Sequence, residues 1–242
     1  RTYCYGTGDE LRVVPAKDGK TDLEALASML DEEVASFYVQ QPNFFGLFED
    51  AEALGQAVHQ AGARYIMGCN PIALAIMKTP RDCGADIAVG EGQPLGLPLG
   101  CGGPYLGYIA ATDKLMRKLP GRIVGETTDD QGRRAYVLSL QAREQHIRRE
   151  KASSNICSNE ALCALTAGLY MATMGPDGMA EAAEQSMAKA HYLEKALCAL
   201  PGVEPVYGGA FFHEFVLKMP RSQELLEALD RRGILGGLPL GD

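Results

Sequence analysis

The 242-residue sequence has no apolar run long enough to cross a bilayer, because glycine, proline or a charged residue interrupts each one. A spanning helix needs about 20 such positions, so we expect no membrane segment. The seven cysteines form no CxxC pair and have no histidine at metal-ligand spacing, so the pattern gives no sign of a metal site. An odd number of thiols without such a pattern favours reduced cysteines, and we expect a cytoplasmic protein.

Positive charge is also scarce. The chain has 23 Lys and Arg against 31 Asp and Glu, which gives a net charge of −8. Its basic residues are scattered apart from short clusters such as Arg148, Arg149 and Lys151, which argues against nucleic acid or an anionic membrane as the main partner. The hydrophobic share of 46% is sufficient for one large core, or for one large and one small domain.

In the first half, short β-rich apolar runs alternate with amphipathic stretches, the pattern of a parallel sheet covered by helices. Residues 21–30 have helical spacing, with Thr21 as the expected N-cap and Glu24 three positions later. Residues 50–61 repeat the pattern from an acidic start that suits the positive end of a helix dipole. The predicted strands are 11–15, 34–40, 64–68, 86–90 and 105–111.

The second half changes composition. Residues 159–200 are rich in Ala, Leu, Met and Glu and predict two bridging helices broken at Gly175-Pro176. Strand-like runs at 203–207 and 211–218 and a helix-like run at 222–231 indicate a small α+β domain. We therefore expect a partial large domain over 1–158, bridging helices over 159–200 and the start of a small domain over 201–242. The chain begins with Arg1 and stops in a turn-like segment, and we expect an excised fragment.

The glycine-rich stretch 90–105 has two interpretations. Successive backbone amides free of side chains can bind an anion, so the stretch could be a phosphate cradle. However, it matches neither GxxxxGK[ST] nor GxGxxG, and strand-like residues rather than a helix follow Pro104. We favour a structural crossing loop, since glycine serves turn geometry more often than chemistry.

Four segments, 40–50, 84–96, 102–105 and 149–157, together resemble the P-protein family of the glycine cleavage system in order and spacing. The resemblance covers essentially the whole chain and is greater to the separate non-catalytic subunit, which is nearly twice this length, than to the catalytic one. It implies an α/β fold of the type I pyridoxal-phosphate transferase class, with a mostly parallel sheet and a small α+β domain. In this family two homologous halves form one working active site.

In the catalytic half of the family, a lysine in the glycine-rich crossing forms a Schiff base with pyridoxal phosphate, and an aspartate pairs with the ring nitrogen. The resemblance places the first position near Gln93-Pro94 and the second on Met67, and no lysine occurs between Lys78 and Lys114. We therefore expect no catalytic and no cofactor-binding residue here, and pyridoxal phosphate in the partner catalytic subunit. The candidates for a vestigial pocket are Asn43, Met67, Glu91, Gln93 and Pro94.

These polar candidates also have ordinary structural interpretations. Asn43 follows Pro42 at the end of a predicted strand, where α/β folds place their sites, but asparagine is equally common as a turn cap. Glu91 and Gln93 in the crossing loop are similar cases. If this half mimics an active one, they line a vestigial pocket or the route of a partner's lipoyl arm. The four histidines are expected to be structural, because no carboxylate or cysteine stands at the spacing of a catalytic dyad.

The resemblance implies a subunit of glycine dehydrogenase, an oxidoreductase, that works in a heterotetramer with catalytic subunit 2 and lipoylated H-protein. The reaction would be glycine decarboxylation and aminomethyl transfer to the lipoyl arm, with this chain as scaffold and interface. Two alternatives stay open: an independent pyridoxal-phosphate transferase or lyase that uses Lys151, and a non-enzymatic scaffold module. A partial large domain exposes a sheet face or edge, and the fragment could cover it by forming a homodimer.

Overall fold

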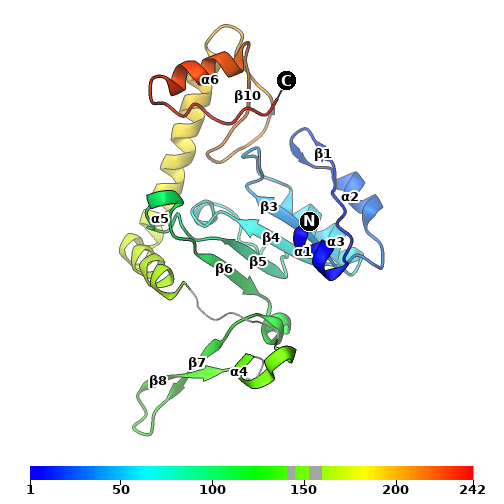
Figure 1. Cartoon of the computed structure of the whole chain (residues 1–242), viewed down its shortest axis with the longest axis vertical. Helices are drawn as coiled ribbons and strands as arrows, with labels where there is room; N and C mark the ends of the chain where they lie inside the picture. Colours follow the sequence, from blue (N-terminus) through cyan, green and yellow to red (C-terminus); the bar gives the residue numbers. More distant parts are fainter. Residues whose placement is uncertain (141–144, 153–159, 242) are drawn as a thin grey trace.

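The structure is a computed structural model that describes residues 1–140, 145–152 and 160–241 (Figure 1). Its centre is a four-stranded sheet in the order β3-β4-β5-β6. The first three strands are parallel, and β6 runs antiparallel to β5. The strands are β3 Ser36–Gln41, β4 Arg64–Cys69, β5 Ile87–Glu91 and β6 Gly107–Ala111. The predicted α/β class and mostly parallel sheet are confirmed.

Two helices cover one face of this sheet at β3 and β4. α3, Ala51–Gln60, begins where predicted, and the Asp50 side chain accepts a hydrogen bond from the Ala53 amide at 3.2 Å. α2, Leu23–Met29, is capped by Asp22, which accepts from the Glu24 and Ala25 amides at 3.0 Å. The predicted Thr21 cap is wrong, because Thr21 belongs to β2, Lys20–Thr21, which pairs with β1, Ala16–Lys17.

The main core lies between these helices and the sheet. Its fully buried side chains include Leu26 of α2, Leu54 and Val58 of α3, and Tyr65 and Met67 of β4. The predicted strand at 11–15 is wrong, because these residues are irregular and belong to no strand. Val14 packs against the core, while Leu11 and Val13 are exposed. A short helix, α1 Thr2–Thr7, precedes it.

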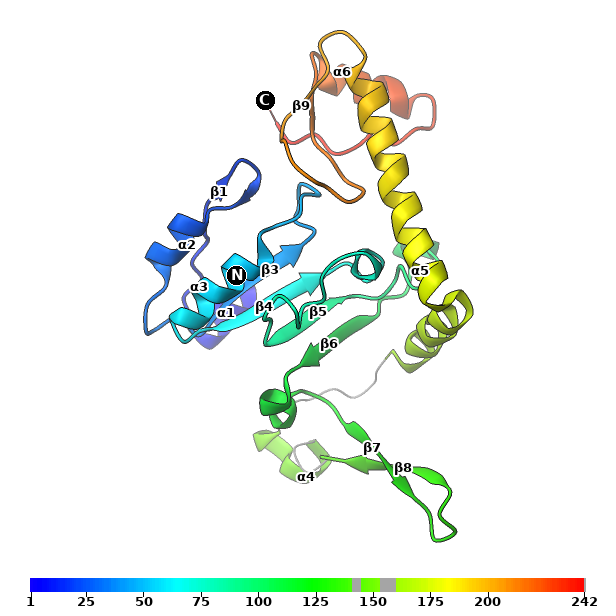
Figure 2. The same ribbon diagram turned by 180° about the vertical axis from the view of Figure 1, so that it is seen from behind.

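The long bridge is α5, Ala161–Cys198, in which Gly175 has non-helical angles of φ 64° and ψ 179° before Pro176. Its two helical parts therefore meet at the predicted break. Beyond it, β9 Glu204–Pro205 pairs with β10 Leu217–Lys218, and α6 Ser222–Asp230 follows (Figure 2). The predicted strands at 203–207 and 211–218 are both reduced to two residues. In the second, Phe211 forms a bridge with Leu47, and Phe212 is buried with Ala73 and Ala183 instead of extending the ladder.

A hairpin that the sequence did not predict projects from the body (Figures 1 and 2). It consists of β7 Ile123–Thr128 and β8 Arg134–Ser139. Short helical turns complete the chain: η1 Ala73–Ala75, η2 Gly100–Gly102, η3 Asp113–Lys118, α4 Gln145–Arg148 and η5 Arg149–Lys151. Within the described ranges, no helix is both long and apolar enough to traverse a bilayer. The domain boundaries at 158 and 200 stay a prediction.

Asp86, just before β5, ties three elements together. One carboxylate oxygen lies 3.0 Å from the Tyr65 amide and from His59 Nε2, and the other lies 3.2 Å from Arg64 Nη1. Burial alone would raise the pKa of Asp86, but the hydrogen bonds from Tyr65, His59 and Arg64 outweigh it and hold the pKa below its usual range. Asp86 therefore stabilises the fold through its charged form.

We expect Asp86→Asn to lower the free energy of unfolding by about 1–2 kcal/mol at pH 7, because hydrogen bonds to a charged group are lost. Since the pKa of Asp86 is lower in the folded state, this contribution is present above the unfolded pKa of about 3.9 and disappears as pH falls through the folded value. Urea unfolding of both proteins from pH 7 to pH 3 measures it. Asp130→Asn, at an exposed turn, is the control, and a difference that does not change with pH contradicts the assignment.

Candidate functional site

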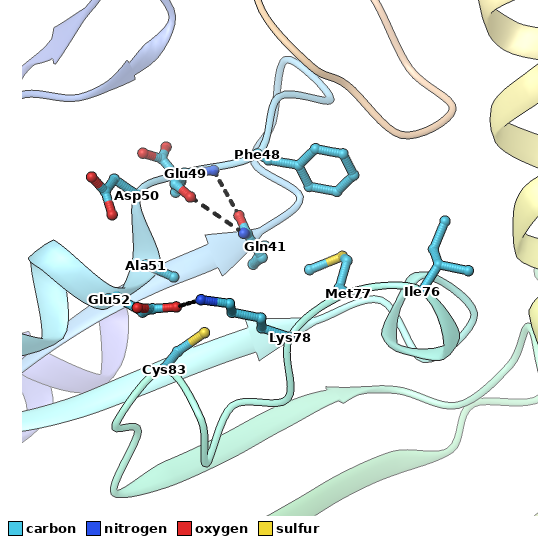
Figure 3. A pocket seen from close by; sticks show the side chains of 10 residues that line it. All are labelled: Gln41, Phe48, Glu49, Asp50, Ala51, Glu52, Ile76, Met77, Lys78 and Cys83. Atoms are coloured by element: carbon cyan, nitrogen blue, oxygen red, sulfur yellow. Dashed lines mark hydrogen bonds and ion pairs between the residues drawn. The ribbon is translucent and has the colours of Figure 1, made fainter.

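The carboxyl ends of the parallel strands meet at one edge of the sheet, which is where α/β folds place ligands. Gln41 ends β3 and lies opposite Cys69, which ends β4, while Glu91 ends β5. Two shallow hollows open beside β3. Figure 3 shows the larger, of about 300 Å³, lined by Gln41, Cys83 and residues 48–52 and 76–78. The smaller, of about 140 Å³, lies between the β1–β2 hairpin and residues 43–45.

Asn43 lies at the boundary of the smaller hollow and is buried. Its Nδ2 donates to the Gly19 carbonyl and to Glu49 Oε1, both at 2.8 Å. Its Oδ1 accepts from the Phe45 and Leu47 amides at 3.0 and 3.1 Å. All hydrogen-bonding capacity of the amide is therefore used to hold the loop after β3. Of its two interpretations, the contacts favour the turn-organising one.

The larger hollow contains a lysine, but its amine is already engaged. Lys78 forms an ion pair with Glu52, and this hydrogen bond raises the pKa of Lys78. A protonated amine cannot attack a carbonyl. Burial raises the pKa of the neighbouring Cys83 thiol, which keeps it neutral. The side-chain oxygen of Gln41 accepts a hydrogen bond from the Glu49 backbone amide at 2.8 Å. The lining thus offers no activated nucleophile.

Met67 is fully buried in the middle of β4. Val39 of β3 and Ala88 of β5 are its register partners on either side. The side chain belongs to the main core cluster, whose other members include Leu54 and Tyr65. Position 67 is therefore filled by apolar packing.

The crossing loop is held together by two of the predicted residues. Glu91 Oε1 accepts from the Gln93 amide at 3.0 Å and from the Leu106 amide at 2.7 Å, which joins the start of the loop to its end. Gln93 Nε2 donates to the Gly102 carbonyl at 3.2 Å. Pro94 is exposed. These bonds support the structural interpretation of residues 90–105.

The candidate residues do not converge on one cavity. Asn43 borders a hollow beside β3, Glu91 and Gln93 bond within the loop after β5, and Met67 is buried between them. No hydrogen bond among the described residues joins the two polar groups. The described ranges also hold no cluster of His, Cys, Asp and Glu that could bind a metal ion.

His59 and His191 make structural contacts. His59 pairs with Asp86, and His191 stacks on Phe211 with ring centroids 3.8 Å apart while its Nε2 lies 2.9 Å from the Phe211 carbonyl. Lys151 is exposed at the end of η5, so its amine is not desolvated as a Schiff-base lysine requires.

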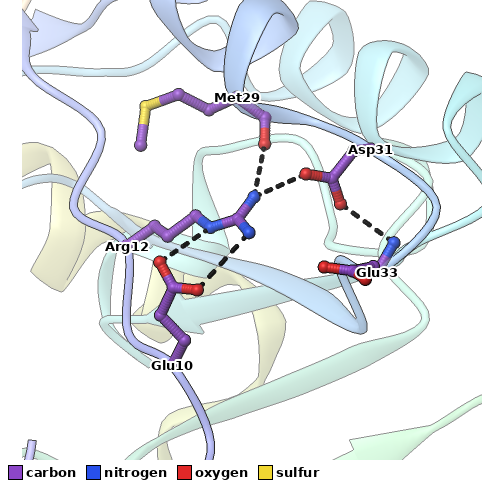
Figure 4. Close-up of polar contacts among 5 residues, drawn as sticks. All are labelled: Glu10, Arg12, Met29, Asp31 and Glu33. Atoms are coloured by element: carbon purple, nitrogen blue, oxygen red, sulfur yellow. Dashed lines mark hydrogen bonds and ion pairs between the residues drawn. The ribbon is translucent and has the colours of Figure 1, made fainter.

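The other charged cluster joins the N-terminal segment to the end of α2 (Figure 4). Arg12 Nη1 lies 2.6 Å from Asp31 Oδ2 and donates to the Met29 carbonyl at 3.4 Å, while Nε lies 3.1 Å from Glu10 Oε1. Asp31 also accepts from the Glu33 amide at 2.9 Å. Because these ion pairs lie at the surface, where water screens them, the cluster contributes little to the stability of the fold.

The groups at positions 67 and 93 do not fit a covalently held pyridoxal phosphate. A thioether cannot pair with a protonated ring nitrogen, and an amide cannot form an imine. The buried setting of Met67 leaves no space for a ring at that point of the sheet.

A family profile described as "Glycine cleavage system P-protein" matches residues 1–236. The chain belongs to the P-protein family. It is 55% identical over 241 residues to a probable glycine dehydrogenase (decarboxylating) subunit 1 of Moorella thermoacetica, in an alignment covering 99% of this chain and 54% of that protein. The counterpart in Desulfitobacterium hafniense is 50% identical with the same coverage. This P-protein chain thus spans about half the length of these relatives.

Solved structures agree with the family. The crystal structure of a glycine decarboxylase (P-protein) of the glycine cleavage system, in inhibitor-bound form, matches with a TM-score of 0.92 and 44% identity, covering 99% of this chain and 54% of that one. A NifS-like protein from Rickettsia africae matches with a TM-score of 0.66 at 17% identity, which shows the fold alone. The fold-type I architecture of this P-protein chain is therefore confirmed.

Proposed function

We propose that this chain belongs to the non-catalytic subunit of a glycine decarboxylase. The family match and the names of the relatives support a role in that enzyme. One observation carries the assignment to the non-catalytic side: Met67 fills, within the apolar core, the position that the resemblance gives to the ring-binding carboxylate. No lysine between Lys78 and Lys114 offers an amine in the crossing loop.

In this proposal the catalytic subunit 2 holds pyridoxal phosphate and decarboxylates glycine, and the aminomethyl group passes to the lipoyl arm of H-protein. This chain contributes scaffold and interface within a cytoplasmic heterotetramer. In this proposal Asn43, Glu91, Gln93 and Pro94 derive from a vestigial pocket that no longer forms one cavity, and the side chains of Asn43, Glu91 and Gln93 now make loop contacts. The exposed Lys151 gives the independent-enzyme alternative no support.

Borohydride trapping tests the proposal. We expect the full chain mixed with pyridoxal phosphate to show no internal-aldimine absorbance and no reduced pyridoxyl adduct, whereas the catalytic subunit shows both. Glycine decarboxylation is expected only when the two subunits and lipoylated H-protein are combined. A pyridoxyl-lysine peptide from this chain contradicts the proposal, and Lys151→Ala then shows whether that lysine carries the adduct.

A further inference from the structure

The C-terminal part of the chain is joined to the sheet by backbone hydrogen bonds beside the larger hollow. The Phe48 amide donates to the Ala210 carbonyl at 3.1 Å. The Phe212 amide donates to the Gly46 carbonyl at 3.0 Å. Both bonds connect the loop after β3 to the segment between β9 and β10, which is far away in sequence. We call this set of contacts the junction.

Two small apolar clusters complete the junction. Each of them joins a residue of the loop after β3 or of η1 to α5 and to the segment between β9 and β10. Their buried members are Leu47, Ala190 and Phe211 in the first cluster and Ala73, Ala183 and Phe212 in the second. The Phe211 and Phe212 side chains are 5% and 1% exposed. These two rings are therefore the largest buried groups that hold the junction together.

The second half of α5 is linked to the same segment and ends at a break in the helix. The His191 ring stacks on Phe211 with centroids 3.8 Å apart, and its Nε2 lies 2.9 Å from the Phe211 carbonyl. At the other end, Gly175 has a φ of 64° and is followed by Pro176, which cannot donate a helical hydrogen bond. We define the lid as residues 176–218. Because a few residues with non-helical angles can absorb a rotation, Gly175 is the expected hinge of the lid.

The junction is smaller than the main core. Among the described residues, ten buried side chains form the main core, whereas each junction cluster has three. Regions with few buried apolar side chains open at a lower free energy than the whole fold. The lid should therefore open while the sheet, α2 and α3 stay folded.

Opening of the lid would uncover one wall of the larger hollow. Phe48, Ile76 and Met77 line this hollow and also pack against the cluster that contains Phe212. Figure 3 shows Ile76 and Met77 on the side of the hollow toward α5. Without the lid, these apolar side chains would face solvent, and the hollow would become wider and more apolar.

We infer that residues 176–218 are a lid on the larger hollow, which turns at Gly175 and is held closed by Phe211 and Phe212. The lid opens as one unit, so the amides of Phe48 and Phe212 lose their hydrogen bonds together. The inference concerns the chain by itself and does not depend on a role in glycine decarboxylation.

Amide hydrogen exchange of the full chain, followed residue by residue by NMR, tests the inference. We expect the protection factors of the Phe48 and Phe212 amides to agree within about tenfold and to lie at least about tenfold below those of β4. Phe212→Ala is expected to speed exchange at both positions by at least about thirtyfold, because it removes a buried ring from the junction. Leu26→Ala is the matched control, since Leu26 is 1% exposed in the main core. It should change exchange at the two positions by less than about threefold.

The unmodified chain alone can overturn the inference. Protection factors of the two amides that differ by more than about tenfold would mean that they open separately. Protection as high as that of β4 would mean that the junction opens only with the whole fold, and so would equal acceleration by Leu26→Ala and Phe212→Ala. If Phe212→Ala does not fold, Phe212→Leu should still speed exchange at both positions by at least about threefold, and unchanged exchange contradicts the lid. Acceleration of both amides by the variants at position 212 alone supports it.

Discussion

Gly46→Ala is expected to lower the free energy of unfolding by at least about 3 kcal/mol, whereas Gly62→Ala should lower it by about 1 kcal/mol. Both glycines have left-handed backbones, with φ of 81° and 79°. A Cβ on Gly46 would lie 1.9 Å from the Glu214 carbonyl oxygen, while a Cβ on Gly62 meets nothing within 4 Å. The two variants share the backbone penalty and differ in the clash.

The clash at Gly46 cannot be relieved cheaply. The Gly46 carbonyl accepts a hydrogen bond from the Phe212 amide at 3.0 Å, and its own amide donates to the Asn43 carbonyl at 2.9 Å. Moving the loop would break these bonds and disturb the buried Phe212. Urea unfolding measures the difference between the variants. Equal destabilisation by both would mean that the loop after β3 and the segment near Glu214 separate freely.

The sequence predicted the strands, the helix start and the helix break that depend on neighbouring residues. Apolar runs located β3, β4, β5 and β6, the acidic residue Asp50 marked the start of α3, and Gly175 marked the break in α5. The β7–β8 hairpin was missed, although Asp129 to Gly132 form a turn-like stretch between two runs rich in strand formers. Local prediction failed where a residue is fixed by distant partners.

Phe211 and Asn43 illustrate that failure. Phe211 and its neighbours have a strand pattern, but Phe211 bridges Leu47, which lies far away in sequence. The bonds of Asn43 to the Phe45 and Leu47 amides fit the local turn-cap interpretation, but its bond to the Gly19 carbonyl, 24 positions earlier, has no local signature. The resemblance identified Met67 as unable to pair with a cofactor ring, but only the packed sheet shows that its surroundings exclude water as well.

Met67→Asp is expected to lower the free energy of unfolding by at least about 4 kcal/mol, or to prevent folding. The native side chain is 0% exposed and packs with Leu54 and Tyr65 in the main core. A carboxylate there loses its hydration, and its protonated form leaves polar atoms without partners. Met67→Leu, which conserves volume and polarity, should cost less than about 1.5 kcal/mol. Denaturant unfolding of both variants measures the difference.

The stability of the Met67→Asp variant should change with pH in the opposite direction to the stabilising contribution of Asp86. Burial without a partner raises the pKa of the introduced carboxyl above its unfolded value of about 3.9, so the folded state binds more protons and the variant loses stability as pH rises. Asp86, whose pKa is lowered, loses its stabilising effect as pH falls. A Met67→Asp protein with native stability at pH 7 would mean that water or a cavity reaches position 67. Replacing one residue would then be enough to restore a charged ring-binding position, and the assignment to the non-catalytic side would lose its main support.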